Sequence, residues 1–371
     1  MRDATDSTLY VGIDAHQDSL SIAVLPETAE RPERAQKIVN EPRAVHRHFS
    51  KLLGRGAVRA TYEAGCTGFV LWRQLTPLGI DCLVAAPSRI PVLPGEHRKT
   101  DRLDAERLAL FLRGGQLTRV TPPSPETEAL RTLTRTRDKA RRDVVSAKHY
   151  VTKLLLNRGV IYRGPRRLWS REHRAWLRGI EMPCPADQDM LDFKRDCLAQ
   201  RESELERLDE RIEERAERAD VELPVRCLRA YRGVATLIAL NLVAELGDVR
   251  RFPNKSAVAA YVGLVPSEQS SGGKVKRGGI TRVGSQHLRR LLIQSVQHYL
   301  RPRAESKTLR ARRAAAPSKV AEHARKTERR LVRRYRRLAA MKHTNVAKTA
   351  IARELVGHMW ASIHPDFGLK S

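Results

Sequence analysis

The sequence has few cysteines, few aromatic residues and no long apolar run, and each shortage excludes a class of protein. Its five cysteines are odd in number and widely spaced among 371 residues, and 5% of residues are aromatic. No CxxC pair or Cys/His ligand spacing occurs, which argues against a disulfide scaffold and against structural zinc. No apolar run approaches a membrane span, and the first residues lack a signal peptide's apolar region. We therefore expect a cytoplasmic protein with no membrane partner.

Acidic residues are also scarce relative to basic ones. The chain has 70 Lys and Arg against 42 Asp and Glu, a formal net charge of +28 and a pI near 10.7. Such an excess goes far beyond what solubility requires and indicates a polyanionic partner. At this length the chain can hold two or three domains, each with its own core. We expect a protein that binds nucleic acid.

The stretch LYVGIDAHQDSLSIAVL at 9–25 reads as a strand, a polar turn and a second strand. Apolar residues alternate before and after the turn, which is the period of a half-buried strand. Asp14 interrupts this pattern with a charge at the end of the first strand. A buried carboxylate is costly unless it is paired or binds a metal ion. An ordinary turn-starting aspartate is the alternative on this stretch alone.

The following segments predict a mixed α/β domain. In order, we expect a strand at 34–40, a helix at 44–53, a strand at 58–62, a helix at 69–78, a strand at 82–86 and a helix at 100–112 with Thr100 as its N-cap. Three strands, a helix, and then alternating strands and helices are the order of the ribonuclease-H-like nuclease fold.

On that fold, acidic residues from separate segments come together. The four that we expect at one site are Asp14, Glu63, Asp101 and Asp104. Asp101 and Asp104 are three residues apart, so one helix face presents both. Hard carboxylate oxygens suit Mg²⁺ or Mn²⁺, and two such ions can support phosphodiester cleavage. Taken singly, Asp101 and Asp104 could be ordinary acidic residues in the first turn of a helix. We interpret Asp18 and Glu106 as solvated residues.

The middle of the chain predicts long helices. A proline-rich hinge at 121–125 precedes an expected basic helix at 126–157, and a second helix is expected at about 190–219. The second carries heptad-spaced apolar residues, as a coiled coil does: Leu191, Leu198, Leu205 and Ile212, with Leu208 between. An antiparallel pair within one subunit and a dimer interface both remain open. The predicted domains are 1–121, 122–222 and 223–371.

The last third predicts a mainly helical domain with two candidate phosphate-binding elements. Residues 228–248 resemble a helix–hairpin–helix DNA-binding element, in which a glycine turn presents N–H groups to a phosphate. Ala235 stands where the second glycine is usual, so a core-packing helix pair is an equal alternative. The expected loop at 263–284 combines Ser270, Ser271 and a double glycine with the cations Lys274, Lys276, Arg277 and Arg282. A serine held there could attack phosphorus, and a flexible basic phosphate-binding loop is the alternative.

Between Arg301 and Arg353 the chain has 18 Lys and Arg against 3 Asp and Glu. Half of these cations lie on an expected helix at 319–340, and those assigned to nucleic-acid binding are Arg329, Arg330, Arg333 and Arg334. A solvated face would interleave acids, so this composition favours binding to a nucleic-acid backbone. A final helix at 345–360 should pack on the preceding domain through Val346, Ile351, Leu355 and Met359.

With these elements in place, the chain resembles the DEDD transposases of insertion sequences, the insertion-sequence one-ten family, which are relatives of the Piv site-specific invertases. The N-terminal part carries VGIDAHQDSLSIAV, YEAG and KTDRLDAERLA. The C-terminal part carries GVATLIALNLVAELGDVRRF, AAYVGLVPSEQSSGGKVKRGGITRVG and HTNVAKTAIAREL. The match runs nearly end to end, in a specific order and spacing.

The resemblance implies a RuvC-like domain, a coiled-coil segment and a C-terminal transposase domain with a nucleophilic serine. It implies that Asp14, Glu63, Asp101 and Asp104 are metal ligands, and that the serine before the double glycine, Ser271, is the nucleophile. Ser270 is its close rival. It further implies a homo-oligomer, a dimer or tetramer, and a structured noncoding bridge RNA that pairs with DNA.

The function that we expect is a Mg²⁺-dependent DNA recombinase that moves its own insertion sequence through serine-linked intermediates. The rivals are a RuvC-type junction endonuclease, which needs the acidic residues but no serine, and a DNA invertase without an RNA guide. A basic architectural protein with a decayed site is a third, and the intact acidic set argues against it.

Overall fold

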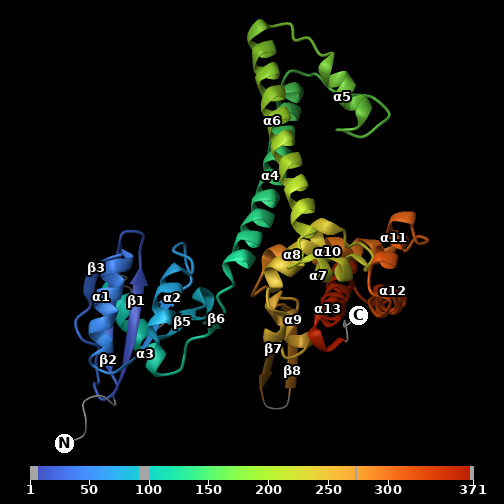
Figure 1. Cartoon of the computed structure of the whole chain (residues 1–371). Helices are drawn as coiled ribbons and strands as arrows, with labels where there is room; N and C mark the ends of the chain where they lie inside the picture. The colour runs from blue at the N-terminus through green and yellow to red at the C-terminus, as the bar shows by residue number, and fades with distance from the viewer. Residues whose placement is uncertain (1–6, 92–100, 272–273, 368–371) are drawn as a thin grey trace, which may run out of the picture. The chain divides into compact units, whose positions relative to one another are not determined.

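A computed structural model describes residues 7–91, 101–271 and 274–367 (Figure 1). The chain divides into two compact units, residues 1–123 and residues 124–371. Within the described ranges, no helix has both the length and the apolar character needed to cross a membrane.

Unit 1 is built on a mixed six-stranded sheet in the order β3-β2-β1-β4-β5-β6. The strands are β1 Thr8–Ala15, β2 Ser19–Pro26, β3 Gln36–Val39, β4 Ala57–Glu63, β5 Asp81–Ala85 and β6 Arg119–Val120. β2 runs antiparallel to both β1 and β3, β4 runs parallel to β1, β5 runs parallel to β4, and β6 returns antiparallel to β5. The predicted sequence of strands is confirmed, and the two-residue β6 is an addition that no pattern indicated.

Alternating residues of β1 face two different layers of helices. Leu9, Val11 and Ile13 belong to an apolar core that includes residues of α1 (Pro42–Leu53) and α2 (Val70–Leu75). The predicted helix at 69–78 ends as a short 3₁₀ turn, Thr76–Leu78. The opposite face of β1 is covered by α3 (Asp101–Arg113), and the predicted N-cap Thr100 lies outside the described residues.

Gly12 sets how closely α3 approaches the sheet. A Cβ atom built at this position would lie 2.0 Å from the carbonyl oxygen of Ala105 and 2.5 Å from the backbone nitrogen of Ala109. No side chain fits there, because real Cβ atoms do not approach backbone atoms so closely. The helix therefore lies directly against the strand, two residues before Asp14.

Unit 2 begins with an antiparallel pair of long helices, α4 (Pro125–Asn157) and α6 (Pro185–Ala216), joined through α5 (Arg171–Arg178) (Figure 1). Arg158, after the end of α4, donates to Asp187 at the start of α6 at 2.7 and 2.8 Å. Nearer the other end of the pair, Arg137 donates to Asp209 at 2.6 and 3.0 Å. We call α4, α5 and α6 together the arm.

The heptad residues of α6 are used within this chain. Leu191, Leu198 and Ile212 are buried, whereas Leu205 and Leu208 are half-buried. The structure thus has the predicted antiparallel pair within one subunit, and the dimer interface stays a prediction.

The remainder of unit 2 is a helical core with one hairpin. Its elements are α7 Glu222–Arg229, α8 Thr236–Leu246, the 3₁₀ turn Val249–Arg251, α9 Lys255–Tyr261, β7 Pro266–Ser271, β8 Lys274–Ile280, α10 Gln286–Leu300, α11 Lys307–Ala315, α12 Ser318–Ala339, α13 Thr344–Ile363 and the 3₁₀ turn Pro365–Phe367. The helices predicted at 286–300, 319–340 and 345–360 are present with small changes at their ends. Ile351, Leu355 and Met359 are buried as expected, but Val346 is 53% exposed because it lies in the first turn of α13.

One expectation for this region is wrong: the expected loop at 263–284 contains an antiparallel hairpin, β7–β8, in which polar and basic residues pair through their backbones. For 228–248, where two alternatives were equal, the structure favours the core-packing helix pair, because most residues of α8 are buried. The turn at Gly233, with φ of 78°, packs so tightly on α10 that a Cβ would lie 2.5 Å from the carbonyl oxygen of Ser295.

Candidate active site and nucleic-acid interface

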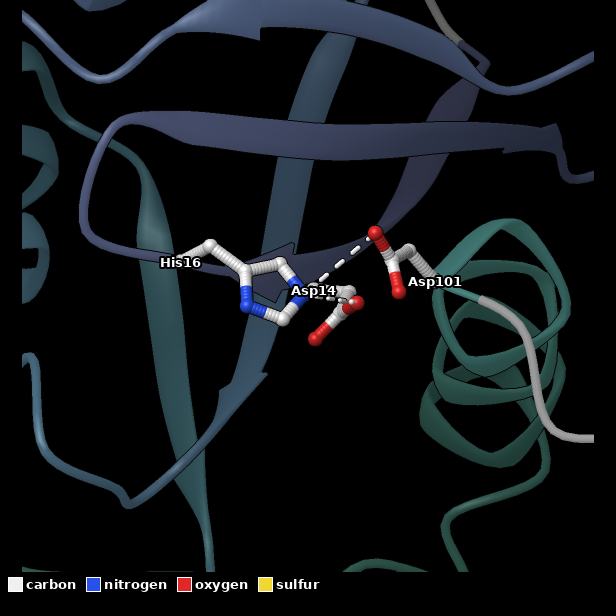
Figure 2. Close-up of side chains that lie close together, drawn as sticks. All are labelled: Asp14, His16 and Asp101. Carbon is white, nitrogen blue, oxygen red and sulfur yellow. Dashed lines mark hydrogen bonds and ion pairs between the residues drawn. The ribbon is translucent and has the colours of Figure 1, made fainter.

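The carboxyl end of β1 and the first turn of α3 bring acidic residues together (Figure 2). Gly12 and Asp14 face the same side of the strand, because side chains alternate along it. The close approach of α3 at Gly12 therefore places its first turn beside Asp14. One ligand atom each from Asp14, His16 and Asp101 lie within 4.8 Å of one another.

Burial and charge repulsion act together on Asp14. Its side chain is 23% exposed, and its pKa is raised chiefly by burial, with the charges of Asp101 and Asp104 adding to the shift. The His16 ring opposes the shift by its charge and by a hydrogen bond. Carboxylates that repel each other at a partly buried site are stabilised by a bound cation.

The other two predicted ligands lie at the edge of this group. Asp104, one turn after Asp101, lies 3.5 Å from Arg107 in a partly buried pair. Glu63 follows Tyr62, which pairs with Ile13 in the parallel register of β4 and β1. The last residue of β4 is thus next to Asp14 on the neighbouring strand, but its carboxylate is not in the close group. Glu106 pairs with Arg102 at 2.7 Å, and Asp18 is exposed in the turn.

His16 is the site residue that the sequence analysis missed. Its Nε2 atom lies 3.0 Å from Asp14 Oδ2 and 3.5 Å from Asp101 Oδ2, between the two carboxylates (Figure 2). In the sequence, the one indication that His16 belongs to the site is its position two residues after Asp14. The surrounding residues have the composition of an ordinary polar turn. Imidazole is a common ligand of divalent transition metals, so His16 extends the donor set beyond oxygen.

The predicted serine and basic residues lie on the β7–β8 hairpin. Ser270 pairs with Val275, and Ser271 pairs with Lys274, at the end of β7. Lys276 and Arg277 continue along β8. The two glycines between the strands, Gly272 and Gly273, lie outside the described residues. Two glycines between short strands are a hairpin signal, and the interpretation as a loop overlooked it.

Arg282 lies just beyond the hairpin in a left-handed backbone conformation, with φ of 56°. Non-glycine residues adopt this conformation rarely, and it tends to occur at functional sites.

The four arginines assigned to α12 divide into two pairs. Arg330 lies 3.7 Å from Glu354, and Arg334 also pairs with that residue. Arg329 and Arg333 are exposed, and no carboxylate in the described ranges lies within ion-pair distance of either. The second pair therefore presents its full charge to solvent.

Two family models match this chain. One, a DEDD transposase model of the IS110 type, covers residues 11–158, and the other, described as the transposase IS116/IS110/IS902 family, covers residues 225–311. The "Putative transposase y4qE" of Sinorhizobium fredii is 38% identical over 301 residues, which are 81% of this chain and 74% of that protein. The chain belongs to the IS110 family of insertion-sequence transposases.

Other relatives of this IS110-family chain carry similar names. The transposase for insertion sequence element IS1533 of Leptospira borgpetersenii is 29% identical over 334 residues, which are 89% of this chain and 96% of the relative. The transposase for insertion sequence element IS1328 of Yersinia enterocolitica is 28% identical over 62% of this chain and 66% of the relative. The match at 11–158 contains all four predicted acidic residues, and the match at 225–311 contains the hairpin with both serines.

Proposed function

We propose that this protein is a Mg²⁺- or Mn²⁺-dependent DNA recombinase that excises and inserts its own insertion sequence through a serine-linked intermediate. The observation that carries the proposal is the grouping of Asp14 and Asp101, from β1 and α3, at the end of a central strand. The strand order of unit 1, with helices on both faces of β1, supports a ribonuclease-H-like, RuvC-like domain.

The residues of the site fit a divalent cation. Asp14 and Asp101 would supply hard oxygen donors, and a bound cation would lower the repulsion between their charges. We assign Asp104 and Glu63 to the same ligand set from the helix turn and the neighbouring strand. When bound, the metal polarises the phosphate and stabilises the leaving oxygen. His16, held by Asp14, can accept or donate a proton beside the same group.

The covalent step is assigned to Ser271, with Ser270 as the alternative. The serine Oγ forms a bond to phosphorus while the bond from phosphorus to one deoxyribose oxygen breaks. The hydroxyl proton leaves to a base, and the freed deoxyribose oxygen takes up a proton. A hydroxyl of another strand then attacks the same phosphorus and releases the serine, so the number of phosphodiester bonds is conserved. Strands are exchanged without hydrolysis.

The proposed partners are the DNA of the element ends and target, and a structured noncoding RNA. Support comes from the net charge of +28 and from the exposed arginines of α12. The cations of the hairpin, Lys274, Lys276 and Arg277, would contact the strand next to the serine. We further propose that the protein is a homo-oligomer and acts in the bacterial cytoplasm at nucleoid DNA. We also propose that each chain has three functional parts, 1–121, 122–222 and 223–371.

The test uses full-length protein co-expressed with the DNA that flanks its gene, so that a cognate RNA is present. Purified protein is mixed with end-labelled junction DNA and Mg²⁺, denatured, and separated on a protein gel. We expect a labelled band at the mass of the protein that is absent in Ser271→Ala. Loss only in Ser270→Ala would move the nucleophile by one residue and keep the mechanism.

The same gel tests the rivals. Free cleaved ends without an adduct, in wild type and in both serine variants, would replace this proposal with a RuvC-type nuclease. Binding without cleavage, in every metal tested, would favour an architectural protein. An adduct formed equally by RNA-free protein would favour an invertase that needs no guide.

A further inference from the structure

Unit 2 contains a cavity of about 810 Å³ beside the base of the β7–β8 hairpin. Its walls come from α4, from the end of β8 and the residues after it, and from the first turns of α10 and α13. The charged residues of the lining are seven cations and one carboxylate: Arg135, Arg141, Arg142, Arg282, Arg289, Arg290 and Lys348, with Asp138. We call this cavity the basic pocket.

The acids near the basic pocket are too few to neutralise it. Glu245, which is 1% exposed, accepts from Arg135 at 2.7 and 3.0 Å. Asp138 accepts from Arg290 at 2.6 Å, and Arg141 and Arg142 approach it only at 3.5 and 3.9 Å; these distances join nitrogen to carboxylate oxygen. In the part of the chain that the structure describes, no carboxylate is in ion-pair range of the remaining lining cations, which are Arg282, Arg289 and Lys348.

Two of these cations are held near each other by backbone contacts. Arg289 donates to the carbonyl oxygen of Val262 at 2.9 Å. The backbone on either side of Arg282 is fixed by Thr281 N–H donating to Val265 and Ser285 N–H donating to Tyr261. Burial lowers the pKa of Arg289, and the positive charge of Arg282 lowers it further. The fold thus maintains a like-charged pair at a strained backbone position, and a bound anion would relieve its repulsion.

Two helices begin at the basic pocket, and their N-terminal ends favour an anionic ligand. The first turns of α10 and α13 both line it, and neither contains an acidic residue. A helix N-terminus carries a partial positive charge, so each adds attraction for an anion. Asn345, Thr349 and Gln286 offer neutral polar groups on the same wall.

We propose that the basic pocket binds backbone phosphates of a nucleic-acid strand, with Arg282, Arg289 and Lys348 as the contacting cations. A volume of about 810 Å³ accommodates more than one phosphate group, which suits a polymer. The inference deepens the proposed function, and it rests on that function for the identity of the polymer. It gives unit 2 a strand-holding site next to the hairpin that carries the serines.

The experiment measures binding of a fluorescein-labelled duplex of the element end to full-length protein in EDTA, so that no cleavage occurs. Wild type is compared with the double variant Arg282→Gln/Lys348→Gln. The matched control is Arg211→Gln/Arg215→Gln, which removes two charges from exposed positions of α6. Thermal unfolding is recorded for all three proteins, and Arg289→Lys serves as a third variant that keeps the charge.

We expect the double variant to bind about tenfold more weakly at about 0.1 M salt, with a salt dependence lower by about two released ions. The control should change affinity less than about threefold, and Arg289→Lys should stay near wild type. Equal losses in the double variant and the control would overturn the inference, because the pocket would then be one part of a diffuse positive surface. Stabilisation of wild type by inorganic phosphate, with unchanged duplex binding by the double variant, would also overturn it in favour of a small free anion.

Failure here is distinguishable from failure of the proposed function. A protein that forms no serine adduct, yet needs Arg282 and Lys348 to bind DNA, would remove the function and keep the pocket. An adduct formed by wild type, together with normal DNA binding by the double variant, would keep the proposed function and remove the proposed role of the basic pocket.

Discussion

Asp14 is held in a position where its charge is unfavourable without a counter-ion. Its pKa is raised by burial and by Asp101 and Asp104. A carboxyl with a raised pKa binds more protons in the folded than in the unfolded protein, so it lowers stability as pH rises above the ordinary aspartate pKa of 3.8. Once the pH exceeds the folded pKa, that loss is complete, and it persists at pH 7.

We therefore expect Asp14→Asn to abolish Mg²⁺-dependent strand cleavage and to leave the metal-free fold at least as stable as wild type at pH 7. The amide keeps the shape but removes both the charge and the metal affinity. Cleavage gels and thermal unfolding in EDTA measure the two effects, and Asp18→Asn in the exposed turn is the matched control. Normal cleavage by Asp14→Asn would contradict the metal-site assignment.

Glu202 has the opposite electrostatic situation. It accepts from Arg174 of α5 at 2.9 and 2.6 Å and lies 3.0 Å from Lys148 of α4, so it joins all three helices of the arm. The hydrogen bond from Arg174 and the contacts with Lys148 lower its pKa from 4.5 to about 2. The stability that it contributes is present above pH 4.5 and is lost as pH falls towards 2.

Glu202→Gln should accordingly destabilise the protein by about 1 kcal/mol at pH 7 and by almost nothing near pH 2, since this pair is only partly buried. The difference in thermal stability between wild type and variant, followed from pH 7 to 2, is the measurement. Glu214→Gln, at an exposed position of α6, should show no comparable pH dependence. A constant difference across this range would contradict the assigned ion pair.

At the scale of elements, the contact of α3 with β1 decides the geometry of the acidic site. Gly12→Ala would place a methyl group against the backbone of α3, so the helix must move outward. We expect a loss of about 2–3 kcal/mol in the free energy of unfolding, together with weaker cleavage, because Asp101 moves with the helix. Chemical denaturation and the cleavage gel test both. Gly54→Ala, where the nearest atom is 3.5 Å from the new Cβ, is the control.

The helix α12 allows a comparison of free and paired cations within one element. Arg329→Gln/Arg333→Gln should weaken duplex binding about tenfold and lower the salt dependence by about two released ions. Arg330→Gln/Arg334→Gln removes the same charge from residues that Glu354 already partly neutralises, so its loss should be clearly smaller. Fluorescence anisotropy at several salt concentrations gives both quantities. Equal losses would show that the pairing with Glu354 does not persist on DNA.

Elements with strong local patterns were predictable from the sequence, and elements that depend on distant partners were not. The alternation in 9–25 predicts β1 and β2, and the periodicity of 286–300 predicts α10. In contrast, α11 has little apolar surface. Its buried Arg313 is paired with Glu305, 8 residues earlier, and with Glu328, 15 residues later, and neither lies on α11. No local pattern carries that information.

The same distinction applies to the candidate site. Asp14 could be chosen from the sequence because it is a charge within a strand pattern. Asp101 and Asp104 could be chosen because a spacing of three residues places them on one face of a helix. The place of His16 between two carboxylates depends on how the turn closes onto α3, and most of the basic pocket depends on four elements meeting. Arg282 was selected for its loop composition alone, whereas its pocket neighbours Arg289 and Lys348 lie on helices that read as ordinary.

At the scale of the whole molecule, each unit has its own apolar core. We expect two unfolding transitions in calorimetry. Gly12→Ala should lower the midpoint of the unit 1 transition. Leu292→Ala, at a fully buried position of α10, should lower the midpoint of the unit 2 transition, because it costs that unit about 2–5 kcal/mol in free energy of unfolding. A single transition that responds to both variants would show that the units unfold together.

The helix α4 belongs to two parts of unit 2 at once. Its first half holds Arg131 and Arg135, which donate to the end of α8 and to Glu245, and its second half packs with α5 and α6 in the outer part of the arm. It has 33 residues, or roughly 50 Å of continuous helix at 1.5 Å per residue, and its one proline is at the first position. The same helix supplies Arg135, Asp138 and Arg141 to the wall of the basic pocket. Because a continuous helix is stiff, we expect a displacement at the far end of the arm to move these three residues, and so to change the proposed binding of a strand in the pocket.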